Sequence, residues 1–124
     1  MELKRVVVTG LGALTPIGNS VEEYWKGLEN GVSGAAPITY FDASDFKTRF
    51  ACELKNFVVN DHLDRKEARK MDRFTQYAMV VSEEAIKDSG LDLEKEDTSR
   101  IGVIWGAGIG GLETFQNEML NHAA

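Results

Sequence analysis

A glycine-rich motif near residue 110 is the first candidate for chemistry. Gly106, Gly108 and Gly111 satisfy the pattern G-x-G-x-x-G, between a predicted strand and a predicted helix. In that setting glycines let a pyrophosphate approach a helix N-terminus, as in dinucleotide-binding domains. The acidic residue that would bind the ribose, about 20 positions later, falls beyond residue 124. The simpler explanation is a tight strand-to-helix turn, in which glycine allows a positive φ and close packing.

A row of cations is the second candidate. A predicted helix carries four cations at positions i, i+3, i+4 and i+7: Lys66, Arg69, Lys70 and Arg73. Residues at this spacing share one helix face. Residues 64–73 hold five basic and three acidic side chains, although the whole chain has a formal net charge of −6. Such a row is either a solvated helix face or a docking surface for an acidic protein.

The other nucleophilic and metal-binding residue types form no site in the sequence. Cys52, the only cysteine, lies on the apolar face of a predicted half-buried strand over residues 48–54, so we expect it in the core. It lacks the histidine or helix N-terminus that would hold a thiolate. His62 and His122 have no metal-ligand spacing with each other or with Cys52. We therefore expect no catalytic residue and no metal site in this chain.

Hydrophobic runs and capping signals predict the elements that position these residues. Residues 6–8 are three valines and residues 101–106 are mostly apolar, which is typical of strands buried on both faces of a parallel sheet. Ser20 opens an S-x-x-E capping box, and Gly31 is a helix terminator.

A second predicted helix carries the cations. Asp64 can cap its first turn, a break is expected near Asp72, and Gly90 suits its left-handed terminus. A further helix follows the glycine motif. The order β-α-β-α-β-α indicates an α/β protein with at least some parallel strands.

Composition excludes several classes of protein. Hydrophobic residues make up 43% of the chain and charged residues 27%, which is typical of a soluble globular protein. No run approaches the roughly 18 apolar residues that span a bilayer, and the N-terminus lacks the pattern of a secretory signal. The net negative charge argues against nucleic-acid binding. A single cysteine suits a reducing compartment, so we expect a cytoplasmic location without membrane insertion.

Three segments, taken together, carry a resemblance to a known family. Residues 4–18 (KRVVVTGLGALTPIG), 65–78 (RKEARKMDRFTQYA) and 101–114 (IGVIWGAGIGGLET) resemble the start of an elongating β-ketoacyl-acyl-carrier-protein synthase of the synthase II type, in the thiolase superfamily. The resemblance implies that residues 1–124 are an incomplete N-terminal portion of the synthase N-terminal domain. It also implies the N-terminal part of a thiolase-like α-β-α-β-α layered fold, and a homodimer when full length.

The resemblance implies a decarboxylative Claisen condensation. In this family a cysteine takes the acyl group from acyl-carrier protein, and two histidines assist decarboxylation of malonyl-acyl-carrier protein. The products are 3-ketoacyl-acyl-carrier protein and carbon dioxide, and no cofactor is required. None of these three catalytic residues falls within the first 124 positions of the family, so we expect the fragment to be inactive alone.

The resemblance also assigns roles within this chain. Lys66, Arg69 and Lys70 match positions that bind the acidic carrier protein, while Gly108 and Ile109 match a loop that lines the acyl pocket. Two alternatives remain. One is a non-catalytic module that only binds the carrier protein. The other is a nucleotide-binding oxidoreductase domain that uses the glycine motif.

Overall fold

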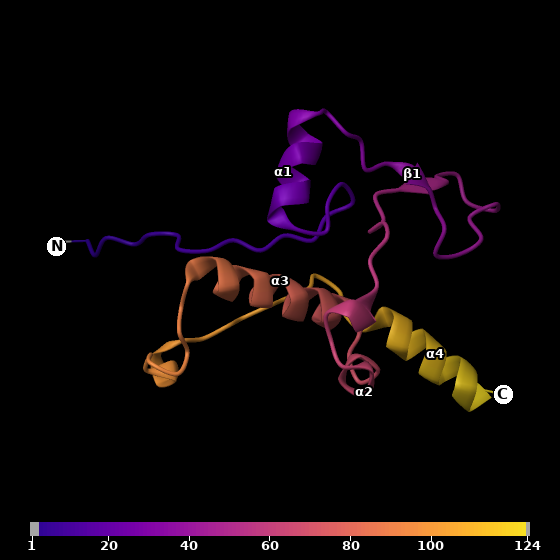
Figure 1. The fold of residues 1–124 in the computed structure, drawn as a ribbon. Helices are drawn as coiled ribbons and strands as arrows, with labels where there is room; N and C mark the ends of the chain where they lie inside the picture. Colours follow the sequence, from indigo (N-terminus) through magenta and orange to yellow (C-terminus); the bar gives the residue numbers. More distant parts are fainter. Residues whose placement is uncertain (1–2, 124) are drawn as a thin grey trace.

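The computed structural model describes residues 3–123 as helices joined by long extended segments (Figure 1). The helices are α1 (Val21–Glu29), α2 (Arg65–Ala68), α3 (Arg73–Ser89) and α4 (Leu112–Ala123), with 3-10 turns at Val59–Asp61 and Thr98–Arg100. Two short strands, β1 (Ala36–Pro37) and β2 (Phe50–Ala51), form an antiparallel pair.

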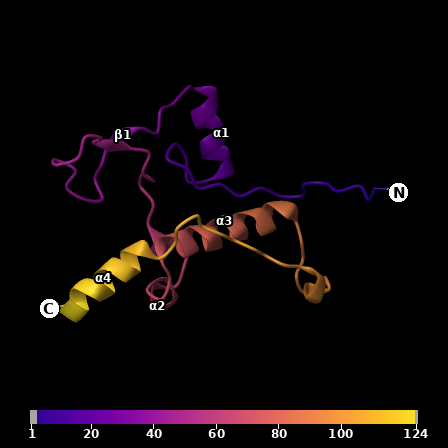
Figure 2. The same ribbon diagram turned by 180° about the vertical axis from the view of Figure 1, so that it is seen from behind.

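Helix α3 is the element around which the other segments lie. The N-terminal segment runs alongside α3, and residues 101–111 return past the same helix before α4 begins (Figures 1 and 2). Both α2 and α4 lie near the N-terminal end of α3. The basic row and the glycine motif, far apart in sequence, therefore meet at one end of a single helix.

Carboxylates of α3 hold the N-terminal segment in place. Glu84 accepts hydrogen bonds from the backbone N–H of Ala13 at 2.7 Å and from that of Val21 at 2.9 Å, one to each carboxylate oxygen. Asp88 accepts from the backbone N–H of Leu11 at 2.9 Å. Hydrogen bonds to an ionised acceptor are among the stronger ones in proteins. They tie the extended segment and the start of α1 to α3.

Two glycines allow this segment to touch the backbone of α3. A Cβ at Gly12 would overlap the carbonyl oxygen of Val81, and a Cβ at Gly10 would overlap that of Ala85. Any side chain at these positions would push the segment away from the helix, so glycine is required by close approach.

The predicted caps of α1 are confirmed, with one change at its start. Ser20 Oγ accepts from the backbone N–H of Glu23 at 3.2 Å, but the Glu23 carboxylate accepts from Asn19 at 2.8 Å and not from Ser20. At the other end Gly31 has φ +62°, and the next N–H, of Val32, donates to the carbonyl of Gly27 at 2.9 Å. This is the Schellman arrangement that glycine favours.

The second predicted helix is divided as expected. Asp64 caps α2 by accepting from the N–H groups of Lys66 at 2.8 Å and Glu67 at 3.3 Å. The chain leaves the helical conformation at Asp72, where ψ is 157°, and α3 begins at the next residue. Gly90 ends α3 with φ +69°, in the left-handed region where glycine carries no Cβ penalty.

The strands predicted at residues 6–8 and 101–106 do not form in this structure. Both segments lack strand pairing, and among residues 3–123 the one sheet is the antiparallel pair of β1 and β2. Their apolar side chains are exposed, with Ile104 100% exposed. A strand needs a neighbour to accept and donate backbone hydrogen bonds, and local composition does not supply one.

The strand predicted over residues 48–54 is shorter than expected. Only Phe50–Ala51 pairs with Ala36–Pro37. Cys52 lies just past the pairing and is exposed, so the expectation that it lies in the core is wrong. The alternating pattern indicated one apolar face, but no second layer covers that face here.

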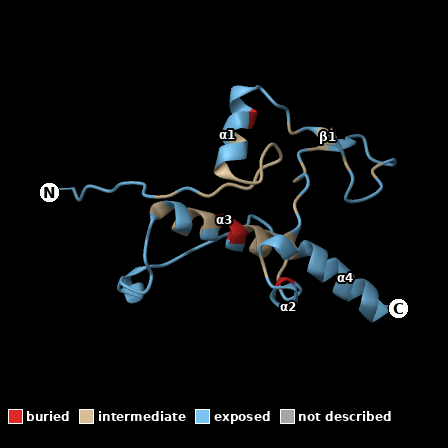
Figure 3. Ribbon diagram, in the orientation of Figure 1, coloured by how far each residue is buried: buried red, intermediate tan, exposed pale blue. Residues whose placement is uncertain are grey.

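Burial is concentrated where α3 meets its neighbours (Figure 3). The buried apolar side chains among the described residues are Ala68, Ala78, Val80 and Val81. Ala68 lies on α2, where its carbonyl accepts from Gln76 of α3, and Val81 lies beneath the N-terminal segment. The core is thus small and centred on one helix.

We predict that Glu84→Ala destabilises the protein much more than Glu83→Ala. The first change removes two charge-assisted hydrogen bonds, each worth about 1.5–3 kcal/mol before relaxation. Glu83 lies on the same helix, and no hydrogen bond or ion pair of its side chain is found within residues 3–123. Urea unfolding measures the difference, and equal losses would show that Glu84 does not anchor the segment.

Candidate functional site

The basic row lies on α2, on the turn that follows it and on the start of α3. Lys66 is within α2, Arg69 is its C-cap, and Lys70 lies in the turn. Arg73 is the first residue of α3. All four side chains are exposed, but the single continuous helix face expected for them is interrupted at residues 69–72. The break at Asp72 gives Arg73 a separate environment.

The four cations differ in their partners. Lys70 Nζ lies 2.7 Å from Glu67 Oε1. Arg73 Nη2 lies 3.0 Å from Glu113 Oε1, and its guanidinium carbon lies 4.5 Å from the centre of the Tyr40 ring. Within residues 3–123, the side chains of Lys66 and Arg69 form neither an ion pair nor a hydrogen bond. These two charges are therefore available to an external anion.

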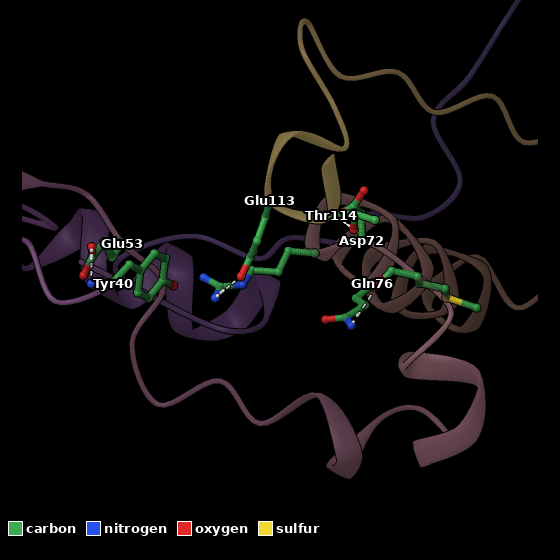
Figure 4. Close-up of polar contacts among 8 residues, drawn as sticks. Tyr40, Glu53, Asp72, Gln76, Glu113 and Thr114 are labelled. Atoms are coloured by element: carbon green, nitrogen blue, oxygen red, sulfur yellow. Dashed lines mark hydrogen bonds and ion pairs between the residues drawn. The ribbon is translucent and has the colours of Figure 1, made fainter. Parts of the chain in front are cut away.

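Gln76 fixes the basic segment to α3. Its side-chain N–H₂ donates to the carbonyl of Ala68 at 2.8 Å. It also donates to the carbonyl of Met71 at 3.2 Å (Figure 4). The carbonyl of Ala68 also accepts from the backbone N–H of Met71 at 3.2 Å, so Gln76 adds a second hydrogen bond to the turn that ends α2. Together with the burial of Ala68, which is 3% exposed, they hold the basic segment on α3.

The glycine motif has an open half and a packed half. A Cβ at Gly106 or Gly108 would meet no atom within 4 Å, and Ile109 is 78% exposed. At Gly110 a Cβ would lie 2.8 Å from the Phe74 ring, and Gly111 has φ +76°. The explanation as a tight turn holds for the end of the motif and does not account for Gly106 or Gly108.

Asp72 and Arg73 hold the packed half. Thr114 Oγ1 donates to Asp72 Oδ1 at 2.7 Å, and Glu113 pairs with Arg73 (Figure 4). The second oxygen of Asp72 lies 3.1 Å from the Cβ position of Gly111. A carboxylate thus lies at the N-terminus of α4, where a dinucleotide would place its pyrophosphate. This arrangement argues against the nucleotide-binding alternative.

An apolar cavity of about 710 Å³ lies beside α3, close to the segment that leads into the glycine motif. Its apolar walls are Ala78, Met79, Ile86, Leu93, Val103 and Trp105. Gly108 and Ile109 do not line it. The structure therefore brings the basic row and the packed half of the glycine motif together, but leaves the predicted acyl-loop residues at the surface.

The remaining candidate residues lie apart from this region. Cys52 is exposed on the hairpin side, and His62 stacks on Phe57 with ring centres 5.4 Å apart. In the part of the chain that the structure describes, no three histidine, cysteine or carboxylate side chains are grouped to hold a metal. Nor does any helix there have the length and apolar character needed to cross a membrane.

Sequence reasoning did not identify the contacts of Asp72 and Arg73 with α4. Residues 72 and 114 are 42 positions apart, and no periodicity links them. The one available signal was the expected helix break at Asp72. Its carboxylate does not cap α3 and can therefore accept a hydrogen bond from another segment.

Tyr40 connects the hairpin to this site through Arg73. Its backbone N–H donates to Glu53, whose carboxylate also accepts from the Thr39 hydroxyl at 2.7 Å. That hydroxyl bond is the main cause that lowers the pKa of Glu53 below its ordinary value of 4.5. Partial burial raises the pKa of Tyr77 on α3 above its ordinary value of 10.

We predict that Thr39→Val raises the pKa of Glu53 towards 4.5, as measured by a carboxyl NMR titration. Because the pKa is lowered in the folded state, Glu53 contributes stability above pH 4.5, and this is lost as the pH falls through the folded value. Thr48→Val is the control, since its hydroxyl has no hydrogen bond in the described chain. The assignment fails if both variants leave the pKa of Glu53 unchanged.

Comparison with known proteins places the chain in a family. The profile described as "Beta-ketoacyl synthase, N-terminal domain" matches residues 3–124. The 3-oxoacyl-[acyl-carrier-protein] synthase 2 of Staphylococcus aureus (strain COL) is 54% identical over 113 residues, covering 91% of this chain and 27% of that protein. That of Synechocystis sp. (strain ATCC 27184 / PCC 6803 / Kazusa) is 51% identical over 118 residues, covering 95% and 28%. The chain spans just over a quarter of the length of these relatives.

Two solved structures are similar to this chain. The ishigamide ketosynthase/chain length factor has a TM-score of 0.62 and 40% identity, covering 71% of this chain and 22% of that one. A type II PKS acyl-carrier protein in complex with its ketosynthase bound to the hexaketide has a TM-score of 0.56 and 28% identity, covering 73% and 23%. These matches confirm the predicted α/β, thiolase-like fold class. The chain belongs to the β-ketoacyl synthase family, and its residues 3–124 match the N-terminal domain of that family.

Proposed function

We propose that residues 1–124 are the N-terminal portion of a synthase that elongates fatty acids, with the catalytic segment outside these residues. The observation that carries the proposal is the 51–54% identity, over nine-tenths or more of this chain, to proteins named 3-oxoacyl-[acyl-carrier-protein] synthase 2. The reaction proposed is condensation of an acyl-enzyme with malonyl-acyl-carrier protein.

The chemistry proceeds in two parts. A cysteine outside residues 1–124 displaces the carrier thiol and forms a thioester with the acyl group, which is nucleophilic catalysis. Malonyl-acyl-carrier protein then loses carbon dioxide, and the resulting carbanion attacks that thioester and expels the cysteine thiolate. The product is 3-ketoacyl-acyl-carrier protein, two carbons longer. Neither step needs an external oxidant or reductant, so no redox cofactor is required.

Lys66, Arg69 and Lys70 form the proposed docking surface for an acidic acyl-carrier protein. Two of the three have uncompensated charge in the described chain, and the segment is held rigidly by Gln76. The third, Lys70, is paired with Glu67 on the surface. Exposed pairs of this kind are worth at most about 1 kcal/mol, so Lys70 can exchange its partner for a carrier carboxylate.

Similarity to a ketosynthase that was solved with its acyl-carrier protein supports carrier docking. Gly108 and Ile109 are the proposed acyl-pocket loop, and the open surroundings of Gly106 and Gly108 leave room for the loop to move. The same family resemblance is the basis for proposing a cytoplasmic homodimer.

A second candidate is a non-catalytic module that binds the carrier protein. The unpaired charges of Lys66 and Arg69 favour it, because docking through them needs no residue outside this chain. Sequencing the transcript past the codon for Ala124 separates the two candidates. A continuing frame with a Thr-Ala-Cys segment and two later histidine motifs supports the synthase, and a stop codon supports the module.

The synthase function is tested by incubating the purified full-length protein with acyl-acyl-carrier protein and malonyl-acyl-carrier protein. Release of carbon dioxide with formation of the elongated 3-ketoacyl product is the expected result. Binding of NAD(H) in a calorimeter, without condensation, would instead favour the oxidoreductase alternative.

We predict that reversing Lys66 and Arg69 to glutamate slows turnover of carrier-bound substrates on the order of tenfold, because complementary charge accelerates encounter. Steady-state rates at several salt concentrations measure the effect, which shrinks as salt rises. Reversing Lys4 and Arg5 to glutamate, two exposed cations of the N-terminal segment outside the basic row, is the charge-matched control. If small thioester analogues slow equally, these residues are not a docking surface.

We predict that Ile109→Phe lowers the rate with long acyl chains relative to short ones, because a larger side chain at a pocket loop leaves less room for the chain. Competition between a short and a long acyl-acyl-carrier protein measures the ratio. An unchanged ratio, with normal carrier docking, removes Ile109 from the pocket.

A further inference from the structure

Three consecutive residues at the start of α3 contact the end of the glycine motif and the first turn of α4. Asp72 accepts a hydrogen bond from Thr114 at 2.7 Å, Arg73 pairs with Glu113 at 3.0 Å, and the Phe74 ring would lie 2.8 Å from a Cβ at Gly110. These contacts join segments about 40 positions apart and come from side chains of different chemistry. We call the set of these contacts the α3–α4 joint.

Beyond the joint the motif has few contacts. Nothing lies within 4 Å of a Cβ at Gly106 or Gly108, and Ile109 is mostly exposed. Segments with few packed atoms open at low free-energy cost, whereas anchored neighbours do not. The boundary between the open and packed halves lies between Ile109 and Gly110.

The joint also lies next to the proposed docking residues. Lys70 and Asp72 are separated by one residue, and Gln76 holds the intervening turn through the carbonyl of Met71. Figure 4 shows the side chains of Asp72 and Thr114 facing each other, with Gln76 nearby on α3. The proposed carrier-binding segment therefore lies only a few residues from Asp72, the anchor of the loop.

We propose that Asp72 is a positioning residue for the loop of residues 106–109. Through Thr114 it fixes the end of the loop, so that motion is confined to residues 106–109 and Ile109 is presented in one position. This proposal rests on the proposed synthase function for its effect on acyl-chain selection. The anchoring itself is a property of the chain and can be tested without activity.

Thr114→Val removes the hydroxyl that donates to Asp72 and keeps the size of the side chain. Thr114→Ser keeps the hydroxyl and should restore the behaviour of the wild type. Thr98→Val makes the same chemical change at an exposed threonine whose hydroxyl has no hydrogen bond in the described chain, and it is the matched control.

Hydrogen–deuterium exchange of the full-length protein is the first measurement. We expect exchange of the Phe115 amide, which donates to the carbonyl of Gly111 at 2.9 Å, to accelerate roughly fivefold in Thr114→Val, because losing one net hydrogen bond shifts a local opening equilibrium by about that factor. Thr114→Ser and Thr98→Val should match the wild type. Unchanged exchange in Thr114→Val overturns the anchoring.

Turnover of a short and a long acyl-acyl-carrier protein is the second measurement. We expect Thr114→Val to change the ratio of kcat/KM between the two chains severalfold, and Thr114→Ser to restore it. Faster exchange with an unchanged ratio overturns the role in chain selection. A wild-type protein without condensing activity would refute the proposed function, while the exchange experiment still decides whether Asp72 anchors the loop.

Discussion

The packing of the N-terminal segment on α3 depends on one requirement, that backbone N–H groups of an extended segment beside a helix find acceptors. In a sheet a neighbouring strand supplies them. Here the carboxylates of Glu84 and Asp88, on α3, accept from the N-terminal segment and from the first residue of α1. The position of α1 relative to α3 follows from these bonds, because one carboxylate holds both Ala13 and Val21.

The opposite end of α3 organises the candidate site in a similar way. Its first residues bind α4, and Gln76 binds the carbonyls at the end of α2. Of the four cations, Arg73 is consumed by structural contacts with Glu113 and Tyr40, whereas Lys66 and Arg69 stay available. A difference in partners, and not in residue type, therefore separates Arg73, which is held by other segments of the chain, from Lys66 and Arg69, which are free to contact an external group.

Local signals predicted the local structure well. The caps at Ser20 and Asp64, the terminator Gly31 and the left-handed Gly90 depend on a few neighbouring residues and are confirmed, although Glu23 does not complete the expected capping box. Strand formation depends on partner strands elsewhere in the chain. The apolar runs at residues 6–8 and 101–106 therefore predicted strands that do not form here. The Asp72–Thr114 contact joins residues 42 positions apart, and no periodic pattern encodes it.

The direct contact of Gly10 and Gly12 with the carbonyls of α3 has a consequence for protein engineering. Elsewhere a library of substitutions can retune an interface one side chain at a time. At these two positions the interface consists of main-chain atoms, so there is no rotamer to repack and no intermediate side-chain size to sample. A directed-evolution campaign on this region would have to change residues of the N-terminal segment and of α3 together, and retain both glycines.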